Sequence, residues 1–216
     1  MKLINYSVND GKTNMQIDSD LLNDAIAKKS EEPIFRLYGW SPKCISLGRN
    51  QNAEFLKSQN TEGIDCVRRL TGGRALLHDD EVTYSCIIPV SSVPNGESVI
   101  GSYKYISGIL IDFFAELGVK LDYGENKKVS THFDYCMLLS TGADVCFQGK
   151  KIIGSAQYRK DGYILQHGSI LFGYDKELLQ KLFNEEVKGI TTVHEILPDI
   201  SKEEFVPALE HYISQL

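Results

Sequence analysis

Hydrophobic and polar positions alternate along the chain in ways that separate helix-like from strand-like segments. Apolar side chains recur at helical spacing from Met15 to Lys29 and again from Gly101 to Leu117, where Gly118 is expected to cap the helix end. Two further helices are expected at Lys176 to Phe183 and at Ser201 to Leu216. The last of these begins with Ser-Lys-Glu-Glu, the pattern of a capping box.

Seven runs rich in β-branched or aromatic residues predict strands. They cover Ile34 to Trp40, Cys44 to Leu47, Ile64 to Val67, Glu81 to Val90, Ala143 to Phe147, Lys151 to Tyr158 and Tyr163 to Phe172. The first two runs are expected to form a strand pair interrupted by Pro42, and the last two a hairpin closed by Lys160-Asp161-Gly162. Strand pairs with a few helices, without regular βαβ alternation, indicate an α+β sheet with helices packed on it.

Composition and charge narrow the function classes. Hydrophobic residues make up 42% and charged residues 24% of the chain, which is ordinary for a globular protein. A net charge of −6 argues against a general nucleic-acid binder, because such proteins carry basic surfaces. No apolar run approaches the roughly 18 residues of a membrane span, and the N-terminus lacks the apolar core of a signal peptide. We therefore expect one cytoplasmic domain over residues 1–216, with neither nucleic acid nor membrane as a partner.

The five cysteines are scattered and lack C-x-x-C spacing, so neither a disulfide framework nor a metal site is indicated. Most are expected to be inert core residues. Cys136 stands in an apolar and aromatic segment, where it could act as a nucleophile if a cation such as Lys151 or His132 stabilised its thiolate. A buried structural cysteine is the competing interpretation, and burial statistics favour it.

The stretch from Cys66 to Ser85 carries the densest candidate chemistry. Its arginines offer guanidinium forks for an anionic group, and its Gly-Gly pair lets the backbone approach a ligand closely. The candidate ligand contacts are Arg68, Arg69, Gly72, Gly73, Arg74 and His78. This pattern indicates a binding loop for an anionic, tailed substrate. A plain hairpin turn with solvated arginines is an equally weighted alternative.

Lys151 and His167 are further candidates. An inward-pointing lysine can anchor a carbonyl or phosphate oxygen with a compact charge, although a solvated lysine is more frequent at a strand end. His167 is either a ligand-lining residue or a hydrogen-bonded core histidine, and the same two interpretations apply to His78. The sequence contains no Ser-His-Asp order, nucleophile elbow, Walker loop or G-x-G-x-x-G run.

Three ordered motifs extend over most of the chain. They read R-R-L-T-G-G-R-A-L-L-H-D from Arg68, G-K-K-I-I-G-S-A-Q from Gly149 and L-Q-H-G-S-I-L from Leu165. Together they resemble the lipoate-protein ligase and octanoyltransferase superfamily, relatives of biotin protein ligase. The resemblance implies the catalytic-domain fold of that superfamily: a mixed, largely antiparallel β-sheet flanked by helices, of the class II synthetase-like type. It also implies an acyl chain held in a tunnel near the Arg-Gly-Gly loop, with Lys151 contacting the acyl carbonyl. Further substrate contacts implied by the motifs are Gly154, Ser155, Ala156, His167 and Gly168.

The residue after the Gly-Gly pair separates two chemistries within this superfamily. Ligases tend to carry a third glycine there, whereas this chain has Arg74 and resembles the cysteine-dependent octanoyltransferases. Those enzymes place their nucleophile upstream of the second motif, and Cys136 matches that position. The resemblance implies transfer of an octanoyl group from acyl carrier protein to Cys136 and then to a lysine of a lipoyl domain, without a cofactor. The acceptors would be lipoyl domains of 2-oxoacid dehydrogenases or the glycine cleavage H protein.

Two alternatives remain open. The Ala-Asp-Val element at 143–145 resembles lipoate-protein ligases, which use ATP with Mg²⁺ and act through a lipoyl-adenylate, and the Met-Leu-Leu run after Cys136 departs from the transferase pattern. Chain length favours the transferase, because no accessory C-terminal domain is expected after the motifs. A non-catalytic lipoyl-binding module is the other alternative.

Overall fold

The computed structural model describes residues 1–124, 144–184 and 186–216. Among these residues, seven strands form a larger sheet and three form a smaller one. Across the larger sheet the order is β1 (Lys2–Asn9), β2 (Ile34–Trp40), β6 (Glu81–Pro89), β10 (Tyr163–Leu171), β9 (Lys150–Lys160), β8 (Val145–Phe147) and β7 (Asp122–Tyr123). β1 and β2 are parallel, and the other neighbouring pairs are antiparallel. The smaller sheet has the order β4 (Asp65–Arg68), β3 (Cys44–Leu47) and β5 (Leu76–His78), with β3 parallel to β4 and antiparallel to β5.

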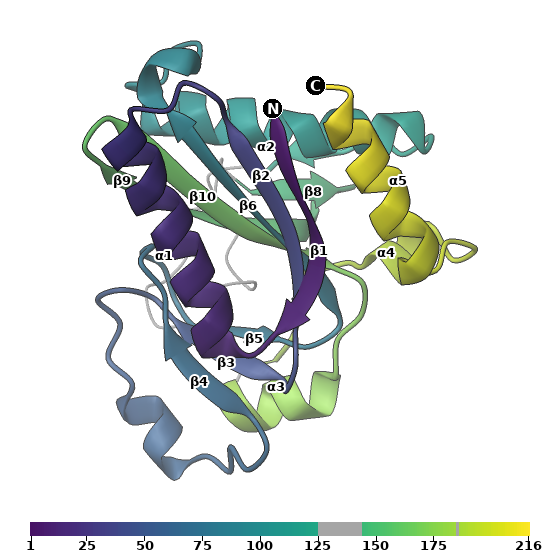
Figure 1. Ribbon diagram of the computed structural model, residues 1–216. Coiled ribbons are helices and arrows are strands. Elements are labelled where there is room, and N and C mark those ends of the chain that lie inside the picture. Colours follow the sequence, from purple (N-terminus) through teal and green to yellow (C-terminus); the bar gives the residue numbers. More distant parts are fainter. Residues whose placement is uncertain (125–143, 185) are drawn as a thin grey trace.

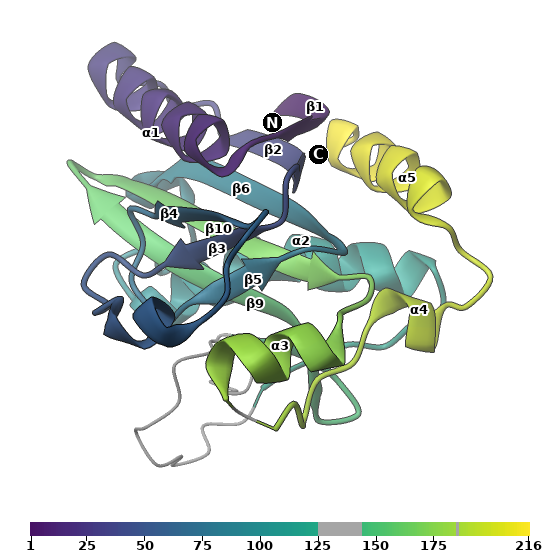
Figure 2. The same cartoon turned by 90° about the horizontal axis from the view of Figure 1, so that it is seen from below.

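Helices cover both faces of the larger sheet, so the expected α+β class with a mixed, largely antiparallel sheet is confirmed. α1 (Gly11–Lys28) lies on one face and α2 (Val99–Glu116) on the other, as Figure 1 and Figure 2 show. The remaining helical elements are α3 (Lys176–Phe183), α4 (Val193–Ile196), α5 (Lys202–Ser214), η1 (Glu54–Ser58) and η2 (Val90–Ser92). α5 contacts β1 and α2, whereas α3 shares an apolar cluster with the smaller sheet. Of the helices in the described ranges, none combines the length and apolarity that a bilayer crossing needs.

The four long predicted helices are present, and their caps explain where they begin. α1 starts four residues before its apolar stripe because the Asp10 side chain accepts a hydrogen bond from the Thr13 backbone at 2.8 Å. Ser98 caps α2 in the same way. The predicted capping box of α5 is formed by Ser201 and Glu204.

All seven predicted strands are present, but two pairing predictions are wrong. The runs at 34–40 and 44–47 do not pair, because both edges of β2 are occupied by β6 and by β1, a strand that the pattern did not predict. The Gly-Gly segment is not a hairpin turn either, since β4 and β5 lie on opposite sides of β3. The β9–β10 hairpin is confirmed, with Asp161 and Gly162 both at positive φ in its turn.

Strand register determines which side chains face α1. Tyr38, Thr83, Ser169 and Gly154 are paired across β2, β6, β10 and β9, so they form one row. Two residues along each strand, a second row on the same face consists of Arg36, Ser85, His167 and Ala156. The α1 face of the sheet is therefore lined by small and polar residues where the smaller sheet approaches it.

Candidate functional site

A pocket lies between the α1 face of the larger sheet and the smaller sheet. The row from Tyr38 to Gly154 forms its floor. Ser46 on β3 and Leu76 on β5 contribute from the smaller sheet, and Met15 contributes from α1. The surface that these side chains offer is mainly apolar, so the pocket suits an apolar chain with few polar anchors.

Seven of the thirteen predicted site residues line this one pocket. They are Arg69, His78, Gly154, Ser155, Ala156, His167 and Gly168. The structure thus brings together residues from all three motifs. Arg68, Gly72, Gly73, Arg74 and Lys151 are not part of the lining, and Cys136 lies outside the described residues.

The Arg69 guanidinium is directed at its own loop. Its Nη1 donates to the Ser46 carbonyl oxygen at 2.7 Å and to the Ser46 hydroxyl at 3.0 Å. Its Nη2 donates to the carbonyl oxygens of Gly72 at 2.9 Å and Arg74 at 2.6 Å. Its Nε donates to the Thr71 hydroxyl at 3.1 Å. The fork that was expected to meet an anionic ligand therefore holds the Gly-Gly segment in shape, and contact of Arg69 with substrate stays a prediction.

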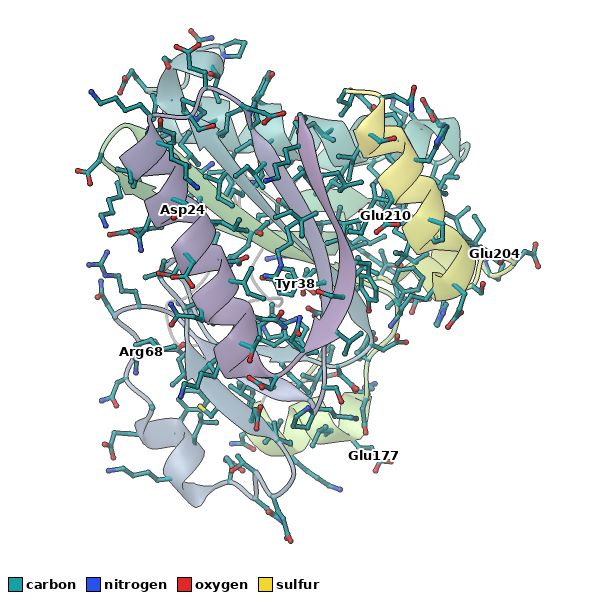
Figure 3. The ribbon with its side chains drawn as sticks, in the orientation of Figure 1. Asp24, Tyr38, Arg68, Glu177, Glu204 and Glu210 are labelled. Carbon is teal, nitrogen blue, oxygen red and sulfur yellow. The ribbon has the colours of Figure 1, made fainter. Side chains whose placement is uncertain are left out.

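Arg68 performs a similar task on the outer side. Its Nη1 donates to the carbonyl oxygens of Gly48 and Gln51, at 2.6 and 2.9 Å. Figure 3 shows Arg68 at the periphery of the molecule, whereas Tyr38 lies in the interior. The glycine at position 48 is required by close approach, because a Cβ there would lie 1.9 Å from the Gly73 carbonyl oxygen. The polar segment after β3 thus supports the Gly-Gly loop and does not line the pocket.

A buried carboxylate on α1 organises one end of the site. The side chain of Asp18 accepts hydrogen bonds from Arg36 at 2.8 Å, from Ser85 at 2.8 Å and from the Tyr38 hydroxyl at 3.0 Å. His167 Nδ1 lies 3.4 Å away from it. Burial alone would raise the pKa of Asp18, but the contacts with His167, Arg36 and Ser85 outweigh it and lower that pKa. Burial lowers the pKa of His167, so a neutral imidazole faces an ionised carboxylate at neutral pH.

A second buried carboxylate, Glu81, organises the other end. Its Oε1 lies 2.6 Å from His78 Nδ1, and the hydroxyls of Thr83 and Ser169 also donate to Glu81. His78 Nε2 is 2.8 Å from the Ser46 hydroxyl. Burial opposes ionisation of Glu81, but its contact with His78 and these hydrogen bonds lower the pKa of Glu81 below its usual value. His78 and His167 are therefore hydrogen-bonded core residues that also line the pocket, which unites the two interpretations offered by the sequence.

The aromatic wall is held rigidly. The ring of Trp40 stacks on His78 with centroids 3.9 Å apart, and its Nε1 donates to the Thr83 hydroxyl at 2.7 Å. Tyr38 packs beside Trp40 and donates to Asp18. The rings of Tyr38 and Trp40 are therefore held in fixed positions where they would contact a bound acyl chain.

The Lys151 side chain points into the protein interior, as it must if it is to anchor a carbonyl or phosphate oxygen of a ligand. Its side chain is 2% exposed, and its Nζ lies 3.0 Å from Asp144 Oδ1. It stands three positions before Gly154 on β9, and its cross-strand neighbour on β8 is Cys146. The ammonium is thus placed on the strand that ends the pocket floor.

Sequence reasoning missed several lining residues. They are Met15, Tyr38, Trp40, Ser46, Leu76, Thr83 and Ser169. One signal was present, because Arg36 is a charged residue within an apolar strand, and such a residue needs a buried partner. The alternating hydroxyls of Thr83 and Ser85 gave a second signal for a polar face.

Comparisons with known proteins agree with the motifs. The family model of the lipoyl protein ligase A/B catalytic domain matches residues 10–214. Octanoyltransferase LipM of Macrococcus caseolyticus is 41% identical over 193 residues, which cover 83% of this chain and 68% of that protein. Octanoyltransferase LipM of Clostridioides difficile is 38% identical over 187 residues, covering 84% and 69%. Lipoate-protein ligase A bound with ATP superposes with a TM-score of 0.72 at 22% identity, covering 99% of this chain and 84% of that one, which shows the shared fold. The chain belongs to the family of lipoyl protein ligase A/B catalytic domains.

Proposed function

We propose that this chain is an octanoyltransferase that moves an octanoyl group from acyl carrier protein, through a thioester on Cys136, to a lysine of a lipoyl domain. The observation that carries the proposal is an apolar pocket lined by residues of all three motifs, in a chain 41% identical to an octanoyltransferase. Its floor crosses four strands, or three spacings of about 4.8 Å each. An extended octanoyl chain, with C–C bonds of about 1.5 Å, is roughly 9 Å long, which is shorter than that row.

The proposed transfer has two steps. Cys136 gives up its thiol proton and its thiolate attacks the octanoyl thioester carbonyl, the bond from that carbon to the carrier sulfur breaks, and the carrier sulfur leaves with the proton from Cys136. The neutral amine of the target lysine then attacks the octanoyl-cysteine carbonyl. An amide forms, the amine proton passes to the departing sulfur, and the Cys136 thiol is restored. Lys151 would stabilise the oxyanion of each tetrahedral intermediate with its ammonium. The acyl group arrives as a thioester, so the transfer uses no ATP.

The thiols of the described residues support this choice of nucleophile. Cys44 and Cys86 are buried, and burial raises the pKa of both thiols, that of Cys86 to about 12. Burial also raises the pKa of the exposed Cys66. A thiol with a raised pKa is almost entirely protonated at neutral pH and is a poor nucleophile. Cys146 is buried next to Lys151 in the sheet, which makes it the matched control for Cys136.

Intact-mass measurement after mixing with octanoylated acyl carrier protein tests the thioester. We expect a single octanoyl adduct on the wild type, none on Cys136→Ala, and an adduct of undiminished yield on Cys146→Ala. An adduct that persists in Cys136→Ala, or one that disappears in Cys146→Ala alone, contradicts the assignment of the nucleophile.

Turnover with and without ATP separates transfer from ligation. We expect octanoylation of an isolated lipoyl domain from the carrier donor without ATP, and no reaction from free octanoate with or without ATP and Mg²⁺. Reaction from the free acid that depends on ATP and survives Cys136→Ser would establish the ligase chemistry in place of the transferase. Binding of octanoate without turnover in either assay would indicate a non-catalytic module.

A further inference from the structure

A continuous chain of buried hydrogen bonds runs through the pocket wall from Asp18 to Glu81. Its members in order are Asp18, His167, Thr71, Arg69, Ser46, His78 and Glu81. Each is 7% exposed or less. Each half consists of a carboxylate, an imidazole and a hydroxyl, and the Arg69 guanidinium joins the two hydroxyls. The sequence predicted neither half, because His167 lies 149 residues from Asp18 and His78 lies 32 residues from Ser46, although Glu81 is only three residues after His78.

The hydrogen bonds run in the same direction in both halves, from the hydroxyl through the imidazole to the carboxylate. In the neutral form of each imidazole, a proton on Nδ1 donates to the carboxylate and Nε2 is an acceptor. The Thr71 hydroxyl, 2.7 Å from His167 Nε2, then donates to it and accepts from Arg69 Nε. The Ser46 hydroxyl donates to His78 Nε2 and accepts from Arg69 Nη1 in the same way. Each hydroxyl is therefore held by an imidazole on one side and by the guanidinium on the other.

This series of hydrogen bonds connects the loop between β4 and β5 to the rest of the fold. Asp18 belongs to α1, His167 to β10 and Glu81 to β6, so both ends are fixed in the larger sheet or the helix above it. Gly72 and Gly73, at the centre of the loop, are exposed. Their position depends on Arg69, which reaches the Gly72 and Arg74 carbonyl oxygens.

We propose that Thr71 and Ser46 are positioning residues, which hold Arg69, a lining residue of the acyl pocket, and with it the loop of residues 69–74. They act through the guanidinium and do not touch the reacting atoms. The Ser46–His78–Glu81 half has the composition of a hydrolytic triad, but the Ser46 side chain is fully buried and its hydroxyl is already bonded to both His78 and Arg69. The inference that Arg69 contacts an acyl chain rests on the proposed function, whereas the inference that Thr71 and Ser46 fix the loop does not.

Thr71→Val tests this assignment, with Thr71→Ser as its matched control. Valine keeps the shape of threonine and removes the hydroxyl, whereas serine keeps the hydroxyl. Limited trypsin digestion reports the loop without any ligand, because Arg74 is a cleavage site within it. We expect cleavage after Arg74 to be about tenfold faster in Thr71→Val, as for loss of one buried hydrogen bond, and unchanged in Thr71→Ser. Equal cleavage rates in Thr71→Val and the wild type would overturn the proposal, as would equal acceleration in both variants.

Kinetics with octanoylated carrier protein report the pocket wall. We expect Thr71→Val to raise the KM about tenfold with kcat within about twofold of wild type, and Thr71→Ser to restore the wild-type KM. A fall in kcat at constant KM would place Thr71 in the chemistry and overturn the positioning role. Titration of free octanoate, followed by the fluorescence of Trp40, the single tryptophan of the chain, supplies a readout besides activity. A loosened loop with unchanged octanoate affinity would contradict the role of the loop in holding Arg69 at the pocket.

Ser46→Ala provides the second variant, from the other half of the chain. It should also accelerate cleavage after Arg74, and the double variant with Thr71→Val should show less than the product of the two single effects, because both act through Arg69. Independent, multiplicative effects would show that the two halves are not joined. These loop measurements hold even if Cys136→Ala retains its octanoyl adduct, so failure of this inference and failure of the proposed transfer are separate results.

Discussion

The two faces of the larger sheet are built from the same strands but carry opposite kinds of side chain. Under α2 the core is aliphatic and aromatic, with Phe113, Phe114 and Phe205 in edge-to-face or tilted contact. Under α1 the same strands present Arg36, Glu81 and His167, together with several hydroxyls. The strict alternation of strand residues makes this possible, since neighbouring positions face opposite sides.

The difference separates stability from site geometry. Burial of a large apolar side chain stabilises the fold by about 1.5–3 kcal/mol, so the α2 face accounts for much of the folding free energy. A buried ion pair such as Asp18–Arg36 adds little net stability, because desolvation offsets the attraction. Its members instead depend on one another, and loss of one leaves the other buried and uncompensated. We therefore expect single substitutions on the α1 face to lower both the free energy of unfolding and the affinity for ligand.

The largest effect is expected from Asp18→Asn. The amide presents a donor where Arg36, Ser85 and Tyr38 all donate, and it leaves the Arg36 charge buried without its counter-charge. We expect the free energy of unfolding, measured with urea, to fall by about 3–5 kcal/mol. Octanoate affinity of the folded fraction should also fall, because His167 loses its anchor.

Asp24→Asn on the same helix is the matched control. Asp24 pairs with Lys28 at the surface, where it is labelled in Figure 3, and an exposed pair contributes little. A loss below about 1 kcal/mol for Asp18→Asn, or equal losses for the two variants, would contradict the dependence of the α1 face on its buried charge.

A comparable or smaller loss of stability is expected on the apolar face from Leu110→Ala. The side chain is fully buried in the core beneath α2, and the truncation leaves a cavity there, at a cost of about 2–5 kcal/mol. In contrast to Asp18→Asn, octanoate affinity measured below the unfolding transition should be unchanged. An equal loss of affinity in both variants would show that the two faces are not separable.

Much of the fold followed from local patterns, and the site followed from them only in part. Helix stripes, capping residues and the Asp-Gly turn act within a few residues, so their elements were predicted correctly. The pairing of β2 and β3 was not, because it depends on which strand fills each sheet edge, and β1 was not predicted although its residues 4–9 alternate between apolar and polar. The motifs likewise marked His78 and His167 as notable but could not show that Asp18, 149 residues before His167, and Glu81, three residues after His78, complete their hydrogen bonds.

The smallest effect concerns pH and sharpens the same comparison. The pKa of His167 is lowered in the fold by burial, whereas in the unfolded chain a histidine titrates near 6.5. As pH falls below about 6.5, the unfolded chain takes up a proton that folded His167 does not, so stability decreases by up to about 1.4 kcal/mol per pH unit. The lowered pKa values of Asp18 and Glu81 add their own loss of stability only near and below pH 4, where carboxyls of the unfolded chain become protonated.

Urea unfolding followed by circular dichroism at pH 7.5, 6.5 and 5.5 measures this dependence. The free energy of unfolding of the wild type should fall with decreasing pH, and the slope should be smaller in His167→Gln. Leu110→Ala should retain the full slope at lower absolute stability, since it leaves His167 and its contacts unchanged. If the wild-type slope persists in His167→Gln, the pH dependence belongs to another group. His167 would then not be the neutral imidazole that accepts a hydrogen bond from the Thr71 hydroxyl.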